Sequence, residues 1–183
     1  MSEWDELKIQ CASCQACPLG ATRHKLVFGV GDPTSEILFI GEGPGEQEDL
    51  QGEPFVGPAG KLLDTMLEII DLDRSHVYIA NIVKCRPPLN RDPKPEEIAA
   101  CHPWLSRQIE LINPRIIVCL GRIAATSLIR EDFRITREHG QWFERNGRKY
   151  IATFHPSALL RDPSRRPDAF MDLREIRKEI KLH

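Results

Sequence analysis

Short runs of apolar residues alternate along the chain with longer segments in which apolar residues recur every three or four positions. The short runs are typical of buried β-strands, and the periodic segments are typical of amphipathic helices. Their alternation predicts an α/β protein with three α/β/α layers and a central, mostly parallel four-stranded sheet. We expect strands at 36–40, 76–83, 115–120 and 150–154, and helices at 2–10, 58–70, 96–111, from 121 onward and at 167–181.

Proline and glycine refine this pattern. The prolines within 86–95 predict a loop, and Pro103 predicts a kink or break in the helix around it. Asn146-Gly147 is typical of a hairpin turn, which would pair 142–145 with the last strand. Because the chain contains neither an internal repeat nor a low-complexity linker, we expect one domain spanning residues 1–183.

Three segments with unusual chemistry follow predicted strands. They are the glycine-rich loop at 41–45, Asn81, and the segment 155–157. Because the carboxyl ends of parallel strands meet at one edge of a sheet, we expect these segments to converge there and form a site.

Each side chain in this group has a plausible chemical role. The Glu42 carboxylate can orient or deprotonate water, and the Asn81 amide can bind the edge of a base. His155 can donate a hydrogen bond to a developing oxyanion, and Phe55 can stack on a base. Taken singly, each residue also has a structural interpretation: a surface glutamate, a turn asparagine, a buried histidine and a core phenylalanine.

Composition narrows the class of protein. The net charge is −2, which by itself does not favour a nucleic-acid partner. No apolar run is long enough to span a membrane, and the N-terminal segment lacks an apolar signal core, so we expect a cytoplasmic protein. Positive charge nevertheless gathers in two loops, which hold Arg86, Arg91 and Lys94, and Arg161, Arg165 and Arg166.

Six cysteines are many for a reducing compartment, where close pairs more often bind metal than form disulfides. Cys14 and Cys17 form a C-x-x-C pair, while Cys85 and Cys101 lie far along the chain. Four thiolates suit either a [4Fe–4S] cluster or a structural zinc ion. Because Cys11 forms a second, overlapping C-x-x-C pair, spacing alone leaves the ligand pair open.

Four segments together resemble the iron–sulfur-containing uracil-DNA glycosylases of family 4. They are CQACPLGATRHKLVFGVGDP, GEGPGEQEDLQGEPFVGPAGKLLD, YIANIVKCRPPLNRDP and FHPSALLRDPSR, and the resemblance covers nearly the whole chain. It implies a monofunctional DNA-repair enzyme that flips uracil out of DNA and hydrolyses its N-glycosidic bond.

The resemblance also assigns residues to roles. Catalysis would fall to Glu42 and His155. The uracil pocket would consist of Gly41, Glu42, Gly43, Phe55, Asn81 and His155. DNA would be contacted by Ser157, Leu159, Leu160 and Arg161, with one of the last three filling the space of the flipped base. A structural [4Fe–4S] cluster would be bound by Cys14, Cys17, Cys85 and Cys101, which leaves Cys11 as an extra thiol.

Other functions stay open at this point. The chain could sequester uracil-DNA without turnover, act on other deaminated bases, or serve as an interaction module, since similar domains occur joined to phage-type polymerases. We expect a monomer that binds single- or double-stranded uracil-containing DNA, and a replication clamp or polymerase partner is left open.

Overall fold

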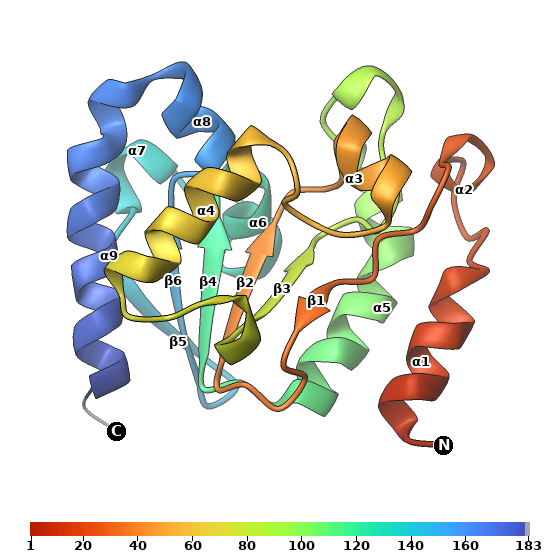
Figure 1. The fold of residues 1–183 in the computed structure, drawn as a ribbon, viewed down its shortest axis with the longest axis horizontal. Coiled ribbons are helices and arrows are strands. Elements are labelled where there is room, and N and C mark those ends of the chain that lie inside the picture. The colour runs from red at the N-terminus through yellow and green to blue at the C-terminus, as the bar shows by residue number, and fades with distance from the viewer. Residues whose placement is uncertain (182–183) are drawn as a thin grey trace.

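The computed structural model describes residues 1–181, which form a six-stranded sheet with helices on both faces (Figure 1). The strands are β1 (Val30–Gly31), β2 (Ile37–Gly41), β3 (Tyr78–Asn81), β4 (Ile116–Leu120), β5 (Trp142–Arg145) and β6 (Arg148–Thr153). The helices are α1 (Glu3–Ala12), α2 (Leu19–Thr22), α3 (Glu46–Gln51), α4 (Pro58–Ile69), α5 (Pro95–Ile112), α6 (Arg122–Leu128), α7 (Ile135–Glu138), α8 (Pro156–Arg161) and α9 (Arg166–Lys181). Short 3₁₀ turns lie at Arg74–His76, Pro88–Asn90 and Pro163–Arg165.

The strand order is β1-β3-β2-β4-β6-β5. The four predicted strands are present as β2, β3, β4 and β6, and neighbours among them are parallel. The predicted count of four is wrong, because β1 and β5 add antiparallel edges. β5 belongs to the hairpin expected around Asn146-Gly147. β1 has only two residues, Val30 and Gly31, so it carries no apolar run that could reveal it. Gly31 and the preceding Gly29 both have positive φ (122° and 145°).

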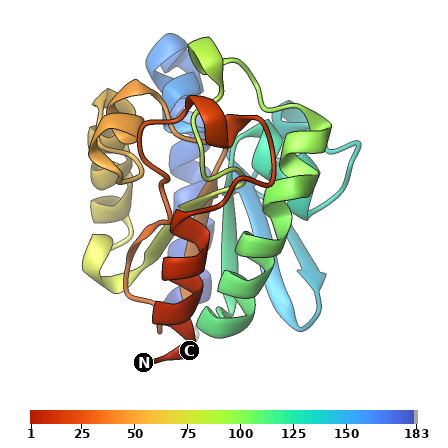
Figure 2. The same cartoon turned by 90° about the vertical axis from the view of Figure 1, so that its right-hand side faces the viewer.

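Alternate residues of each central strand point to opposite faces of the sheet, which produces the three layers. Ile37 and Phe39 of β2 pack on one side with α4, α8 and α9. Leu38 and Ile40 pack on the other side with α5 and α6. The view turned by 90° shows α4 and α5 on opposite sides of the sheet (Figure 2). The predicted α/β/α layering is therefore confirmed.

Helix α5 runs unbroken through Pro103, so the break considered there is wrong. A proline removes one backbone hydrogen bond, but its ring here lies on the exposed side of the helix. The opposite side of α5 buries Leu105 and Ile109 against the sheet, which stabilises the continuous helix. None of the helices within residues 1–181 is long and apolar enough to cross a membrane.

Candidate active site

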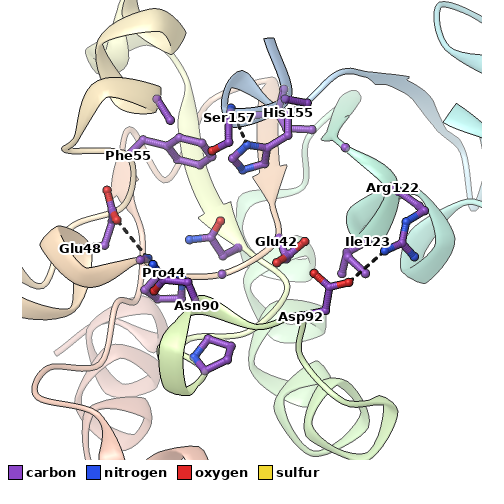
Figure 3. Close-up of a pocket in the computed structure, with 18 of the residues that line it drawn as sticks. Glu42, Pro44, Glu48, Phe55, Asn90, Asp92, Arg122, Ile123, His155 and Ser157 are labelled. Atoms are coloured by element: carbon purple, nitrogen blue, oxygen red, sulfur yellow. Dashed lines mark hydrogen bonds and ion pairs between the residues drawn. The ribbon is translucent and has the colours of Figure 1, made fainter. Parts of the chain in front are cut away.

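A cavity of about 490 Å³ opens at the carboxyl edge of the parallel strands. Glu42 follows β2, Asn81 ends β3 and His155 follows β6, and all three line the cavity together with Gly43 and Phe55 (Figure 3). The convergence predicted from the strand ends is therefore present, because parallel strands place their carboxyl ends along one edge.

His155 lies at the start of α8 as a neutral hydrogen-bond donor. Its Nδ1 accepts a hydrogen bond from the backbone N–H of Ser157 at 3.0 Å, so the proton of the neutral ring is on Nε2. Burial, and to a lesser extent the charge of Arg161, lower the pKa of His155 to about 4, while Glu48 opposes the shift. At neutral pH the site thus holds an uncharged imidazole with one N–H to donate.

Phe55 stacks on this imidazole, with ring centroids 5.4 Å apart and planes inclined by 28°. Its backbone is left-handed (φ 54°), which costs a bulky residue about 1–2 kcal/mol. Arg74 stabilises this conformation by donating hydrogen bonds to the carbonyls of Phe55 and Pro54. Gly60 gives the Phe55 carbonyl room, since a Cβ there would lie 1.9 Å from that oxygen. The orientation of Phe55 is therefore fixed from outside the cavity.

Asn81 carries a buried acceptor without a donor. Asn81 is only 2% exposed, and its side-chain Oδ1 has no hydrogen-bond partner among residues 1–181. An unpaired buried acceptor costs about 1–3 kcal/mol, so its persistence points to a ligand. Gly41 keeps the adjoining space open, because a Cβ there would lie 2.7 Å from Oδ1 and 2.6 Å from the Phe55 ring.

Glu42 is half-buried at the end of β2. Burial raises the pKa of Glu42, the nearby Asp92 raises it further, and Arg122 and Arg161 oppose the shift. Arg122 holds Asp92 by an ion pair of 3.1 Å between Nη2 and Oδ2. Figure 3 shows Glu42 and Asp92 at the same side of the cavity. No sequence pattern indicates that Asp92 and Arg122 line the cavity, because both reach it only through tertiary structure.

Glu48 joins two loops that shape the cavity. One carboxylate oxygen accepts the N–H of Gly45 at 3.0 Å, and the other accepts the N–H groups of Val56 (3.0 Å) and Gly57 (3.3 Å). The sequence analysis placed no helix between the strand at 36–40 and the helix at 58–70, so it missed both α3 and Glu48. An acid three residues after a helix-capping position is the signal that identifies it.

The predicted DNA-contacting residues divide into two groups. Ser157 and Arg161 line the cavity, and Leu160 is 41% exposed beside it. Leu159 is only 2% exposed because it packs into the core layer of α4 and α9. The prediction that Leu159 contacts DNA is therefore corrected.

A second, smaller cavity is lined by the four cysteines predicted as cluster ligands, Cys14, Cys17, Cys85 and Cys101. N–H groups point at three of the sulfur atoms. Trp104 Nε1 lies 3.2 Å from Cys14 Sγ, Arg23 Nη1 lies 3.3 Å from Cys85 Sγ, and the Lys84 backbone nitrogen lies 3.3 Å from Cys101 Sγ. Such N–H···S hydrogen bonds stabilise ligating thiolates.

Four thiols around one cavity are a donor set that suits an iron–sulfur cluster. Within residues 1–181, no group of His, Cys, Asp or Glu side chains is arranged to hold a metal ion. Lys84 is fully buried there and forms none of the ion pairs in the described part of the chain, so it suits an anionic cluster. Cys11 does not line this cavity and packs with Leu7 and Phe28.

Fold and cavity define an α/β protein with a ligand site at the carboxyl edge of its sheet. The sequence pattern of the uracil DNA glycosylase superfamily matches residues 28–179, and the chain belongs to that superfamily. A type-4 uracil-DNA glycosylase of Archaeoglobus fulgidus is 47% identical over 184 residues, covering 96% of this chain and 92% of that protein. One of Thermotoga maritima is 50% identical over 155 residues, covering 82% and 80%. A DNA polymerase of Bacillus phage SP01 is 33% identical over 140 residues, which are 76% of this chain and 15% of the polymerase.

Proposed function

We propose that this chain is a hydrolase that excises uracil from DNA in base excision repair and leaves an abasic site. The superfamily match and the similarity to type-4 uracil-DNA glycosylases support this activity. The observation that carries it is the unpartnered Oδ1 of Asn81, buried in the cavity near the Phe55 ring. A planar ligand with an N–H donor supplies what this atom lacks.

Uracil matches this arrangement when its base is flipped out of the helix. Its ring stacks on Phe55, while Asn81 Oδ1 accepts from N3–H and the amide nitrogen donates to O4. Cytosine has no N3–H and carries an amino group in place of O4, so both hydrogen bonds are lost. The bulk of the pocket excludes the methyl group of thymine.

Bond cleavage follows from the same geometry. As the C1′–N1 bond breaks, its electron pair leaves with uracil and the sugar becomes an oxocarbenium ion. The Nε2–H of His155 and backbone N–H groups near Gly41 and Gly43 stabilise the negative charge on O2. Glu42 stabilises the cation and accepts a proton from water as the hydroxyl adds to C1′. Transfer of that proton through solvent to the uracil anion gives neutral uracil and regenerates the Glu42 carboxylate.

The four cysteines Cys14, Cys17, Cys85 and Cys101 are proposed to hold a [4Fe–4S] cluster, which when bound supplies a structural cross-link. It ties the N-terminal segment to the loop after β3, next to Asn81. Cys85→Ser should reduce soluble, brown protein and its iron content, whereas Cys119→Ser, a buried core thiol outside this cavity, should not. A colourless wild type purified without oxygen, or loss of iron in Cys11→Ser alone, would refute this ligand set.

We further propose that residues 1–183 act as one monomeric domain in the cytoplasm, on single- or double-stranded DNA. Arg161 at the cavity and the basic loop around Arg86 support backbone contact despite the net charge of −2. The similarity to part of a phage DNA polymerase makes a polymerase or replication clamp the partner to test by co-purification.

The first experiment is uracil release from an oligonucleotide with one uracil, comparing U·G, U·A, T·G and single-stranded substrates. Release of free uracil with T·G inert is the expected result. Glu42→Gln and His155→Ala should retain DNA binding and lose turnover. Tight retention of uracil-DNA by the wild type without release would instead indicate a sequestering protein.

A further inference from the structure

Leu89 has the highest exposed fraction of the large apolar side chains within residues 1–181. It is 93% exposed and lies in the 3₁₀ turn Pro88–Asn90, between β3 and α5. Its φ of 57° and ψ of 25° are left-handed, a conformation disfavoured for leucine. Asn90 follows with a φ of 57°. The fold thus holds Leu89 in a strained conformation without burying its side chain.

The turn is braced by hydrogen bonds on both sides of Leu89. Arg86 Nε donates to Asn90 Oδ1 at 2.7 Å, and the Asn90 N–H donates to the carbonyl of Pro87 at 3.0 Å. Just beyond the turn, the Arg91 guanidinium binds both oxygens of Glu97 at 2.8 and 2.9 Å. These contacts hold the leucine in one place. Strain that the surroundings maintain in this way is characteristic of functional sites.

The turn forms one side of the mouth of the candidate active site. Pro87 and Asn90 line the cavity from this side, and Ser157 lines it from α8. Figure 3 shows Asn90 and Ser157 on opposite sides of the cavity, and Figures 1 and 2 show the turn and α8 at the same end of the molecule. Leu160, 41% exposed, lies on α8. DNA that delivers a base into the cavity therefore meets an exposed leucine on each side.

We propose that Leu89 is a DNA wedge, which inserts its side chain between stacked bases beside the flipped uracil. This inference rests on the proposed excision of uracil from DNA. Apolar side chains that unstack a base step recover the cost of unstacking through new contacts. Arg86 and Lys94 supply positive charge on the same loop for the neighbouring phosphates. Leu89 and Leu160 together would hold the duplex open from two sides.

The test compares duplex and single-stranded substrates that carry one uracil in the same sequence. Leu89→Ala should lower single-turnover excision from duplex U·A roughly 10- to 100-fold, the loss expected when a leucine is no longer buried. Excision from the single strand should change less than about twofold, since it offers no paired stack to open. Ile9→Ala, which alters an apolar side chain 59% exposed on α1, is the matched control and should change neither rate.

Two further measurements separate a wedge from a folding role. Leu89→Gly relieves the left-handed strain, so it should raise Tm while lowering duplex excision as Leu89→Ala does. The fluorescence of 2-aminopurine beside uracil should increase on binding to wild type and increase less with Leu89→Ala. Unchanged duplex excision by Leu89→Ala would overturn the wedge. Equal losses on both substrates would overturn it as well, whereas a wild type inactive on both would refute the proposed function itself.

Discussion

Replacing His155 with alanine should remove a specific loss of stability at acid pH. In the fold, burial holds the pKa of His155 at about 4, against an ordinary value of 6.5. As the pH falls below 6.5, His155 becomes protonated in the unfolded chain, whereas in the folded chain it stays neutral until about pH 4. The stability contributed by the neutral imidazole is therefore complete above pH 6.5 and is lost as the pH falls toward 4.

The size of the effect follows from these two pKa values. At pH 4.5 a group of this kind lowers the free energy of unfolding by about 2–3 kcal/mol relative to pH 8. His155→Ala also loses the hydrogen bond to the Ser157 N–H, worth about 0.5–2 kcal/mol at every pH. The free energy of unfolding of the wild type minus that of the variant should therefore fall by about 2–3 kcal/mol from pH 8 to pH 4.5, which is enough to make the variant the more stable protein at the lower pH.

Urea unfolding monitored by tryptophan fluorescence at the two pH values measures this difference. Groups that titrate equally in both proteins cancel. Uracil release at pH 8 by His155→Ala should fall about 10²–10³-fold with the loss of an oxyanion donor. A stability difference independent of pH would refute a neutral His155, and with it the assignment of the donor to Nε2.

Substitutions at three other residues test the remaining parts of the site. Asn81→Ala should lower kcat/KM about 5- to 150-fold while unfolding free energy falls little, because an unpaired buried acceptor is removed; a parallel loss of stability would show a structural role instead. Asp92→Asn removes a neighbour that raises the pKa of Glu42, so the acid limb of the kcat/KM–pH profile should move to lower pH, and movement to higher pH would contradict this electrostatic coupling. Arg74→Gln should free Phe55 and lower kcat/KM at least about tenfold. Arg74→Lys should recover only part of the lost kcat/KM, because an ammonium group lacks the planar set of N–H donors of a guanidinium. Full recovery would show that positive charge alone is sufficient.

The sequence predicted the central strands well because their apolar runs are continuous and end in glycine or polar residues. It predicted the meeting of Glu42, Asn81 and His155 for the same reason, since parallel strands bring their ends together. Strand β1 was not predicted because its two residues, Val30 and Gly31, are too few to show a periodic pattern. Its pairing with β3 depends on tertiary contacts.

The parts of the site that the sequence did not predict are those built by distant contacts. Arg74 reaches the Phe55 carbonyl from before β3, and Asp92 reaches the cavity from a proline loop. Neither lies in a pattern that marks it as different from a surface charge. Leu159 and Leu160 show the same limit, since adjacent residues of one short helix differ in exposure from 2% to 41%.

The three hydrogen bonds that Glu48 accepts tie the two cavity loops to α3. If the pocket binds the base without closing over it, the DNA must deform to deliver the base. Such a pocket would select for two properties together, the identity of the base and the weakness of its pairing. Unpaired uracil should be the most readily processed, uracil in a wobble pair with guanine next, and uracil paired with adenine last. In this way the contacts of Glu48 on α3 would favour excision of uracil from weakly paired positions in the double helix.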